Sequence, residues 1–375
     1  MKIINYMAIL FWLFLICNLG HVLSRQTDFP NTENQLIFTS ILFRHGQRNP
    51  NGFYTRDPYK NMSYWPDGLG MLTKTGKLRE YELGQWLGKR YKSLIPDGKY
   101  SEQLVYIQST DVDRTLMSAQ ANLAGLFYPS KEEMWSDLPW QPIPVHTVPK
   151  KLDKLLKVEF PCPRLQKEEK IVRKSKFLKK YNKERKQLYK YLTKHTGDKV
   201  KEPQHCGTIY TNLLIESQTI SNFTIPDWAE KIYPDLLHQI GGFSFSIPTS
   251  TTILKRLRGG PLLKDIITHM KLKRNGTLDP NRNLWLYSAH DDNVAALLNT
   301  MGVFEHHMPP FVATVMIDLR KNAKNEFFVE VHYRNSTAEP TLLTIPGCTP
   351  SCPLDEFESY LSQVIPGDWD TECKH

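Results

Sequence analysis

The chain of 375 residues has few of the features that mark the specialised protein classes. It has only six cysteines, too few for a small disulfide-rich scaffold, and no internal repeat or low-complexity linker. Beyond the first 24 residues, no apolar stretch reaches membrane-spanning length. Its 40% hydrophobic and 11% aromatic residues can form a substantial core, which excludes disordered, collagen-like and coiled-coil proteins. The length favours one large domain or a core domain with an insertion.

The charge balance is basic, with 48 Lys and Arg against 39 Asp and Glu, a net charge of +9. The excess is concentrated in a lysine-rich stretch around residues 170–186. Such runs are mostly solvated helix faces, and the alternative is long-range attraction of anionic substrates or surfaces. With 25 prolines, 17 tyrosines and 8 tryptophans, the composition is not that of a nucleic-acid-binding tail. We therefore expect no nucleic-acid partner.

The first 24 residues predict export. Lys2 supplies a positive amino-terminal region, residues 9–17 form the centre of an apolar run, and Val22 and Ser24 suit a cleavage site after Ser24. The alternative is a membrane anchor, but the apolar run is shorter than the roughly 20 residues that a spanning helix needs. We predict a signal peptide over residues 1–24 and a secreted mature protein without a membrane span, the lysosomal lumen being the alternative location.

Asparagine and cysteine usage agrees with the secretory pathway. Four Asn-x-Ser/Thr sequons are candidate glycosylation sites: Asn61, Asn222, Asn275 and Asn335. Cys17 leaves with the signal peptide, so five cysteines remain, enough for two disulfides and one leftover thiol, Cys206. Cys348 and Cys352 could close a local loop. A zinc site there is the competing interpretation, but no neighbouring His or Cys completes four ligands.

Hydrophobic patterning predicts an α/β fold. Three short apolar runs, each followed at once by polar residues, read as strands buried on both faces of a largely parallel sheet: 36–43, 104–107 and 284–287. Helical spacing occurs at 73–94, 114–127 and 293–301, the last ended by Gly302, and a later edge strand is expected near 327–333. We predict a three-layer sandwich with a mostly parallel central sheet flanked by helices.

Residues from about 131 to 250 differ from this pattern. They begin with a connector rich in Trp and Pro and continue as lysine-rich helices without a clear strand. We predict that residues 25–130 and 251–375 form the α/β core and that residues 131–250 form a mostly helical insertion subdomain.

The strongest local signal is RHGQRNP at residues 44–50, directly after the first predicted strand. Ligands of open α/β sheets bind beyond the carboxyl ends of strands. Arg44 and Arg48 present planar forks suited to phosphate oxygens, and His45 between two cations is kept neutral and nucleophilic. Gly46 allows the backbone to turn. The alternative is a surface turn with incidental charges. It requires that five specified residue types occur together by chance in this seven-residue window.

These residues resemble the RHGxRxP motif of the histidine acid phosphatases, a branch of the histidine phosphatase superfamily. Three further blocks, at 109–119, 140–146 and 288–291 (SAHD), also resemble the family, as does PGCTPSCPL at 346–354. The similarity spans essentially all of the mature chain. It is strongest to the prostatic and lysosomal acid phosphatases of animals and to insect venom acid phosphatases.

The resemblance implies a role for each matching residue. His45 would attack phosphorus and form a phosphohistidine, and Asp291 would protonate the leaving alcohol and later help to deprotonate water. Four residues would bind the phosphoryl oxygens: Arg44, Arg48, Arg114 and His290. No metal or cofactor is implied, because the arginines supply the positive charge. By motif position Cys162 would pair with Cys373 and Cys348 with Cys352. A homodimer is suggested by the resemblance alone.

Local alternatives exist for two of these residues. Asp291 could be merely the N-cap of the following helix, but Asp292 is an equally good cap, and we assign capping to Asp292. Arg114 lies at a predicted helix N-terminus, where a cation is unfavourable unless an anion is near, which supports a phosphate-binding role. Tyr54 and Trp65 could line the mouth of the pocket, but we expect them to be core residues. We expect His146 and His332 to be structural.

The predicted function is a secreted acid phosphatase that hydrolyses orthophosphoric monoesters, most active at acid pH. One alternative is a phytase or inositol-polyphosphate phosphatase of the same superfamily. A second, from another class, is a non-enzymatic secreted binding or venom protein on the same scaffold. A phosphoglycerate-mutase-like transferase is disfavoured by the insertion and by the pair His290 and Asp291.

Overall fold

The computed structural model describes residues 34–157 and 161–374. The predicted signal peptide and the membrane-anchor alternative lie outside these residues. All helices and strands named below belong to one compact unit, Gln35–His375.

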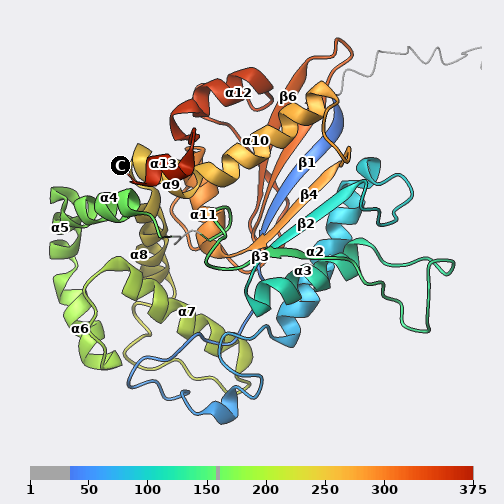
Figure 1. Cartoon of the computed structure of the whole chain (residues 1–375). Coiled ribbons are helices and arrows are strands. Elements are labelled where there is room, and N and C mark those ends of the chain that lie inside the picture. The colour runs from blue at the N-terminus through green and yellow to red at the C-terminus, as the bar shows by residue number, and fades with distance from the viewer. Residues whose placement is uncertain (1–33, 158–160, 375) are drawn as a thin grey trace, which may run out of the picture. The chain divides into compact units, whose positions relative to one another are not determined.

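A mixed β-sheet forms the centre of this unit (Figure 1). Its strands are β1 (Gln35–Arg44), β2 (Val105–Thr110), β3 (His146–Val148), β4 (Leu284–Ala289), β5 (Thr314–Lys321), β6 (Phe327–Arg334), β7 (Thr341–Leu343) and β8 (Cys352–Pro353). Their order is β3-β2-β4-β1-β5-β6-β7, and β8 pairs with β6. The first four in this order are parallel, and the remaining pairs are antiparallel.

The predicted strands at 36–43, 104–107 and 284–287 are confirmed as β1, β2 and β4. The strand predicted near 327–333 is β6, but the expectation of an edge strand is wrong. It lies between β5 on one side and β7 and β8 on the other, so both of its edges are paired.

Helices cover both faces of the sheet, which confirms the predicted α/β class. On one face lie α2 (Lys74–Arg90) and α3 (Asp113–Leu126), and on the other lie α10 (Gly260–Asn275), α11 (Asp291–Thr300) and α12 (Leu354–Leu361) (Figure 1). Alternation along β1 divides the core. Phe38 and Leu42 join the cluster under α10 and α11, whereas Ile41 and Phe43 join the cluster under α2 and α3. This two-sided burial explains why β1 reads as a nearly continuous apolar run.

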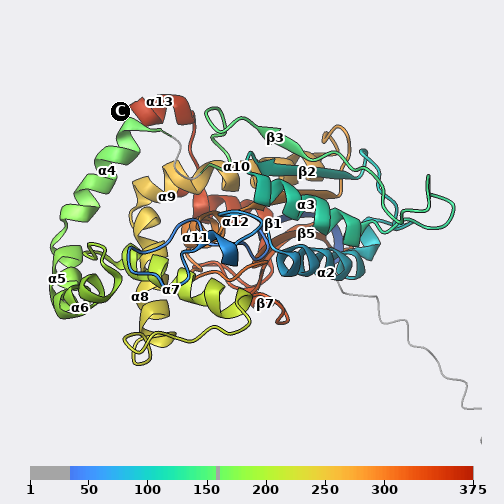
Figure 2. The same cartoon turned by 90° about the horizontal axis from the view of Figure 1, so that it is seen from below.

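A group of helices extends from the sheet on the side away from α2 and α3 (Figures 1 and 2). They are α4 (Pro163–Lys174), α5 (Lys176–Glu184), α6 (Lys186–Thr196), α7 (Pro203–Thr219), α8 (Asp235–Ser246) and α9 (Thr252–Arg258). Parts of α6, α7 and α8 share an apolar cluster of their own. The strand β3 pairs with β2 in the central sheet, although we expected the insertion to begin at residue 131. It is short and largely exposed, so no apolar run marks it in the sequence.

Two disulfides occur among the described residues. Cys162, at the start of α4, bonds to Cys373 in α13 (Trp369–Lys374), and Cys348 bonds to Cys352. Cys206 is a buried free thiol in α7. Burial raises the pKa of this thiol to about 12, so it is protonated at physiological pH and chemically inert.

Candidate active site

The parallel strands bring three segments that are far apart in the sequence to one edge of the sheet. Arg44 at the end of β1 is in register with Ala289 at the end of β4, and Ser109 of β2 is in register with Ser288. The backbone N–H of His45 donates to the Ala289 carbonyl at 2.9 Å. A cavity of about 270 Å³ opens beyond these ends, and its lining includes five of the predicted residues: His45, Arg48, Arg114, His290 and Asp291.

The imidazole of His45 is buried and held in one tautomer. Its Nδ1 lies 2.8 Å from the Gly46 carbonyl oxygen, which can only accept, so Nδ1 carries the hydrogen and Nε2 keeps a free lone pair. Burial, followed by Arg44 and His290, lowers the pKa of His45 well below its usual value. The ring is therefore neutral at acid pH, with Nε2 available as a nucleophile.

Gly46 allows the motif to approach helix α2 closely. A Cβ on Gly46 would lie 2.4 Å from the Gly76 carbonyl oxygen of α2, and a Cβ on Gly76 would lie 2.1 Å from the Gln47 carbonyl oxygen. The Gly46 N–H also donates to the Ser118 hydroxyl of α3 at 3.1 Å. Close approach to α2, rather than a positive φ, is thus what requires glycine here.

Three arginines converge on the site. The buried Nε atoms of Arg44, Arg48 and Arg114 have no hydrogen-bond partner among residues 34–157 and 161–374. Burial and the neighbouring Arg44 lower the pKa of Arg48 to about 9, and burial lowers the pKa of Arg114. Buried N–H donors without partners and repulsion among three positive charges both raise the free energy of the empty site. A bound anion would offset both, so the cluster is suited to phosphoryl oxygens.

Arg44 is fixed by three contacts. Its Nη1 donates to the Pro309 carbonyl at 2.6 Å, its Nη2 lies 2.7 Å from Asp291 Oδ2, and its guanidinium lies 4.2 Å from the centre of the Phe311 ring. Burial raises the pKa of Asp291, but the charges of Arg44 and Arg48 outweigh burial, so this pKa is lowered. Asp291 is therefore ionised in the structure, and a proton must reach it before it can act as an acid.

His290 is oriented by two threonines. The Thr115 hydroxyl donates its hydrogen to the backbone carbonyls of Val112 and Thr110. The hydroxyl of Thr110 therefore donates to the Thr115 hydroxyl, and it accepts a hydrogen bond from His290 Nε2, which lies 3.1 Å away. Burial and Arg114 lower the pKa of His290 to about 4. The single N–H of the neutral His290 ring thus donates to Thr110. A bound phosphate, being negatively charged, would favour a second proton on Nδ1.

The capping of α11 differs from our prediction. The N-cap is His290, whose backbone N–H donates to Asn293 Oδ1 at 3.1 Å, while Asp291 and Asp292 occupy the first helical turn. The assignment of capping to Asp292 is therefore wrong. Carboxylates in the first turn are still favourable, because the helix N-terminus is electropositive.

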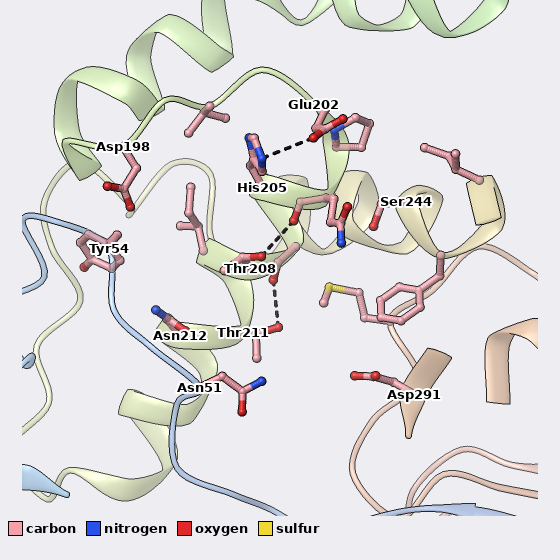
Figure 3. Close-up of a pocket in the computed structure, with 18 of the residues that line it drawn as sticks. Asn51, Tyr54, Asp198, Glu202, His205, Thr208, Thr211, Asn212, Ser244 and Asp291 are labelled. Carbon is pink, nitrogen blue, oxygen red and sulfur yellow. Dashed lines mark hydrogen bonds and ion pairs between the residues drawn. The ribbon is translucent and has the colours of Figure 1, made fainter. Parts of the chain in front are cut away.

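A second, larger cavity adjoins the first (Figure 3). Its volume is about 630 Å³, and Arg48, Asn51, Asp291 and Asp292 line both cavities. Tyr54 also lines the larger one, so it is more than the core residue we expected, whereas Trp65 is a buried core residue. No motif in the sequence indicated this second cavity, because its other walls come from scattered segments, chiefly the loop after β1, the turn before α7, α7 itself and the end of α8.

Residues 34–157 and 161–374 contain neither a candidate metal cluster nor a membrane-spanning helix. No cluster of three or more His, Cys, Asp or Glu side chains within those ranges could hold a metal ion. None of the described helices is both long and apolar enough to cross a bilayer.

The neutral histidine and the arginine cluster at the edge of an α/β sheet define a site suited to a phosphoryl group. Residues 22–334 match the family model of the histidine phosphatase superfamily, branch 2. The chain therefore belongs to that superfamily, as its sequence predicts.

Relatives and solved structures agree with this family. The chain is 39% identical to prostatic acid phosphatase of Homo sapiens over 355 residues, 90% of this chain and 88% of the relative. It is 37% identical to lysosomal acid phosphatase of Rattus norvegicus, over 92% of this chain and 82% of the relative. The apo form of Hafnia alvei phytase superposes with a TM-score of 0.70 at 18% identity, covering 90% of this chain and 98% of that one, and thus supports the fold.

Proposed function

We propose that the chain is an acid phosphatase that hydrolyses phosphomonoesters through a phosphohistidine at His45. The observation that carries the proposal is the neutral His45 with a free Nε2 lone pair among three arginines whose Nε–H groups lack partners in the described residues. A phosphoryl group placed there would face a nucleophile and a ready set of donors. Family membership and the 39% identity to an acid phosphatase also support it.

Each half of the reaction uses the same two residues. In the first half, the Nε2 lone pair of His45 forms a bond to phosphorus, the P–O bond of the ester breaks, and the leaving oxygen takes a proton from Asp291. In the second half, water loses a proton to Asp291, its oxygen bonds to phosphorus, and the P–N bond breaks to release phosphate and His45. Arg44, Arg48 and Arg114 stabilise the charge on the three other oxygens.

Because the pKa of Asp291 is lowered, the proton for the leaving group must come from the substrate, and this makes activity depend on acid pH. A phosphomonoester has a second pKa near about 6, so below this pH it binds as a monoanion and brings its own proton. An ionised Asp291 with a monoanion holds as many protons as a neutral Asp291 with a dianion, and the dianion pairs better with the arginines. Activity should therefore fall as pH rises above the substrate's second pKa, while His45 stays neutral on the acid side.

The test is hydrolysis of ethyl phosphate, whose leaving oxygen needs a proton, from pH 3 to 9. We expect an acid optimum and a decline toward pH 9. A rate that climbed steadily to pH 9 would contradict the assignment of Asp291 as the acid. Parallel assays with phytate address the phytase alternative, and no turnover of any ester by the folded protein would favour the non-enzymatic alternative.

We further propose export with glycosylation. The side chains of Asn61, Asn222, Asn275 and Asn335 are all exposed, so each sequon is accessible to a glycan. Expression in a secreting eukaryotic host followed by glycosidase treatment should lower the apparent mass, and detection only in the lysosomal lumen would favour the alternative location. The division into core and insertion and the homodimer remain proposals. Limited proteolysis and sedimentation test them.

A further inference from the structure

The larger cavity, lined in part by Asn51, Tyr54, Thr208, Thr211 and Asn212, lies where the leaving group of a substrate would extend. Arg48 and Asp291 line both this cavity and the one that contains His45. Asp291, which we propose to protonate the leaving oxygen, faces the larger cavity from the side opposite α7 (Figure 3). An ester with its phosphate at His45 would therefore direct its alcohol portion past Asp291 into this space.

The α7 wall of the cavity presents hydrogen-bond acceptors. The hydroxyls of Thr208 and Thr211 donate to backbone carbonyls one turn earlier, at 3.2 and 2.9 Å, and the Asn212 amide donates to the Gly52 carbonyl at 3.0 Å. Their hydrogens are thus partly or wholly used, whereas lone pairs on their oxygens remain. Positions i, i+3 and i+4 lie on one face of a helix, so these groups lie close together (Figure 3).

Tyr54 adds a buried hydroxyl that can both donate and accept. Its side chain is only 4% exposed, and its hydroxyl has no hydrogen-bond partner among the described residues. A buried hydroxyl without a partner is costly, so a ligand that bonds to it gains from the interaction. A ligand hydroxyl suits both Tyr54 and the α7 acceptors, because it also donates and accepts, whereas an ammonium group only donates.

The charges farther from His45 do not favour a second phosphate. Asp198 and Glu202 oppose Arg173 and Lys199 on the cavity wall, so the formal charges cancel. Glu202 lies 3.1 Å from Arg173 and 3.4 Å from His205 (Figure 3), so these groups are already paired with one another. A site for several phosphates would need an excess of unpaired cations.

We propose that this cavity is a leaving-group subsite for polyhydroxylated alcohols, so that sugar or polyol monophosphates are preferred over alkyl phosphates and over polyphosphates. This proposal rests on the proposed function. It assigns Tyr54, Thr208 and Thr211 to substrate specificity.

The test compares kcat/KM for glucose 6-phosphate, ethyl phosphate and phytate. The first two both release a primary alcohol, so their ratio reports on the rest of the leaving group. We expect wild type to prefer glucose 6-phosphate to both other substrates. Tyr54→Phe and Thr211→Val should each reduce its kcat/KM by about threefold to tenfold with little change for ethyl phosphate. Thr268→Val is the matched control, because Thr268 donates to a carbonyl one turn earlier in α10 and does not line the cavity.

The outcomes separate the two proposals. A wild type that hydrolyses glucose 6-phosphate and ethyl phosphate equally well, or prefers phytate, would overturn the subsite while leaving the phosphatase proposal intact. Equal losses for both simple esters in Tyr54→Phe would likewise show that Tyr54 acts on folding or chemistry rather than on specificity. If no ester is turned over, the proposed function fails, and calorimetry of His45→Ala with glucose 6-phosphate and ethyl phosphate still decides whether the cavity prefers the sugar.

Discussion

Asp291→Asn is the substitution that separates protonation of the leaving group from phosphate binding. It keeps the size of the side chain but removes both the transferable proton and the ion pair with Arg44, whose Nη2 lies 2.7 Å from Asp291 Oδ2. A positioned general acid contributes about 10²–10⁴-fold to rate. Ethyl phosphate needs this proton because ethoxide is a poor leaving group, whereas p-nitrophenolate departs as a stable anion.

We therefore expect kcat/KM for ethyl phosphate to fall about 10²–10⁴-fold and that for p-nitrophenyl phosphate to fall about tenfold or less. The assay is steady-state kinetics with both esters at the acid optimum. Asp291→Glu is a useful control, because it retains a carboxyl and should retain part of the ethyl phosphate activity. Equal losses for the two esters would refute the assignment of Asp291 as the acid.

The same variant tests the charge balance of the site. Without the Asp291 carboxylate, Arg44 loses this ion pair and stays among other cations, and breaking a buried pair in this way costs about 3–5 kcal/mol. The Asp291 side chain is 24% exposed, so we expect a smaller loss in the free energy of unfolding. Inorganic phosphate should restore stability to the variant by more than it stabilises wild type, measured by urea unfolding. No difference between the two would contradict the inference that both phosphate and the Asp291 carboxylate offset the positive charge of Arg44.

Three further predictions concern stability. Burial beside Asp57 raises the pKa of Glu216 to about 9, so its proton stabilises the fold at acid pH and this contribution is lost as pH rises from the unfolded value of about 4.3 toward 9. Glu216→Gln should flatten this pH dependence in denaturation between pH 5 and 9, and an unchanged slope would contradict the raised pKa. Cys162→Ala opens a disulfide with a sequence separation of 211 and should lower the free energy of unfolding by about 2–5 kcal/mol, whereas a loss below about 1 kcal/mol would show that the bond is dispensable. Gly84→Ala places a Cβ 1.9 Å from a carbonyl oxygen of α3 and should cost at least about 1–3 kcal/mol, while Gly88→Ala, with 3.4 Å of clearance, should be neutral or stabilising; similar thermal shifts for both would contradict the close approach of α2 and α3.

The parallel part of the sheet can be predicted from the sequence, because strands that are buried on both faces consist of nearly continuous apolar residues. β1, β2 and β4 appear as apolar runs, and the polar residues after them mark the carboxyl ends where the site forms. β5 was not predicted, since Asp318 interrupts its apolar run. Asp318 is tolerated there because it accepts hydrogen bonds from Thr39 and Tyr91 at 2.6 and 2.9 Å, partners that only the tertiary structure brings near.

The site divides in the same way. Arg44, His45 and Arg48 lie within five residues, so a short motif identifies them, and the resemblance adds Arg114, His290 and Asp291. The second cavity has no such motif, because Tyr54 and Thr211 acquire a shared environment only when α7 packs beside the loop after β1. Glu216 gave no signal either. An isolated glutamate in a helix reads as a surface residue unless its neighbour across the fold is known.

The central claim is a covalent phosphohistidine at His45, and trapping it is the most direct test. The experiment uses a substrate labelled with radioactive phosphorus and three proteins: wild type, His45→Ala and the exposed-histidine control His146→Ala. Each protein would be mixed with the substrate at acid pH, quenched rapidly, and worked up under alkaline conditions that preserve phosphohistidine. We predict label on the peptide that contains His45 in wild type and in His146→Ala, with label and turnover both lost in His45→Ala. Label on another residue, or turnover that survives in His45→Ala, would contradict the account.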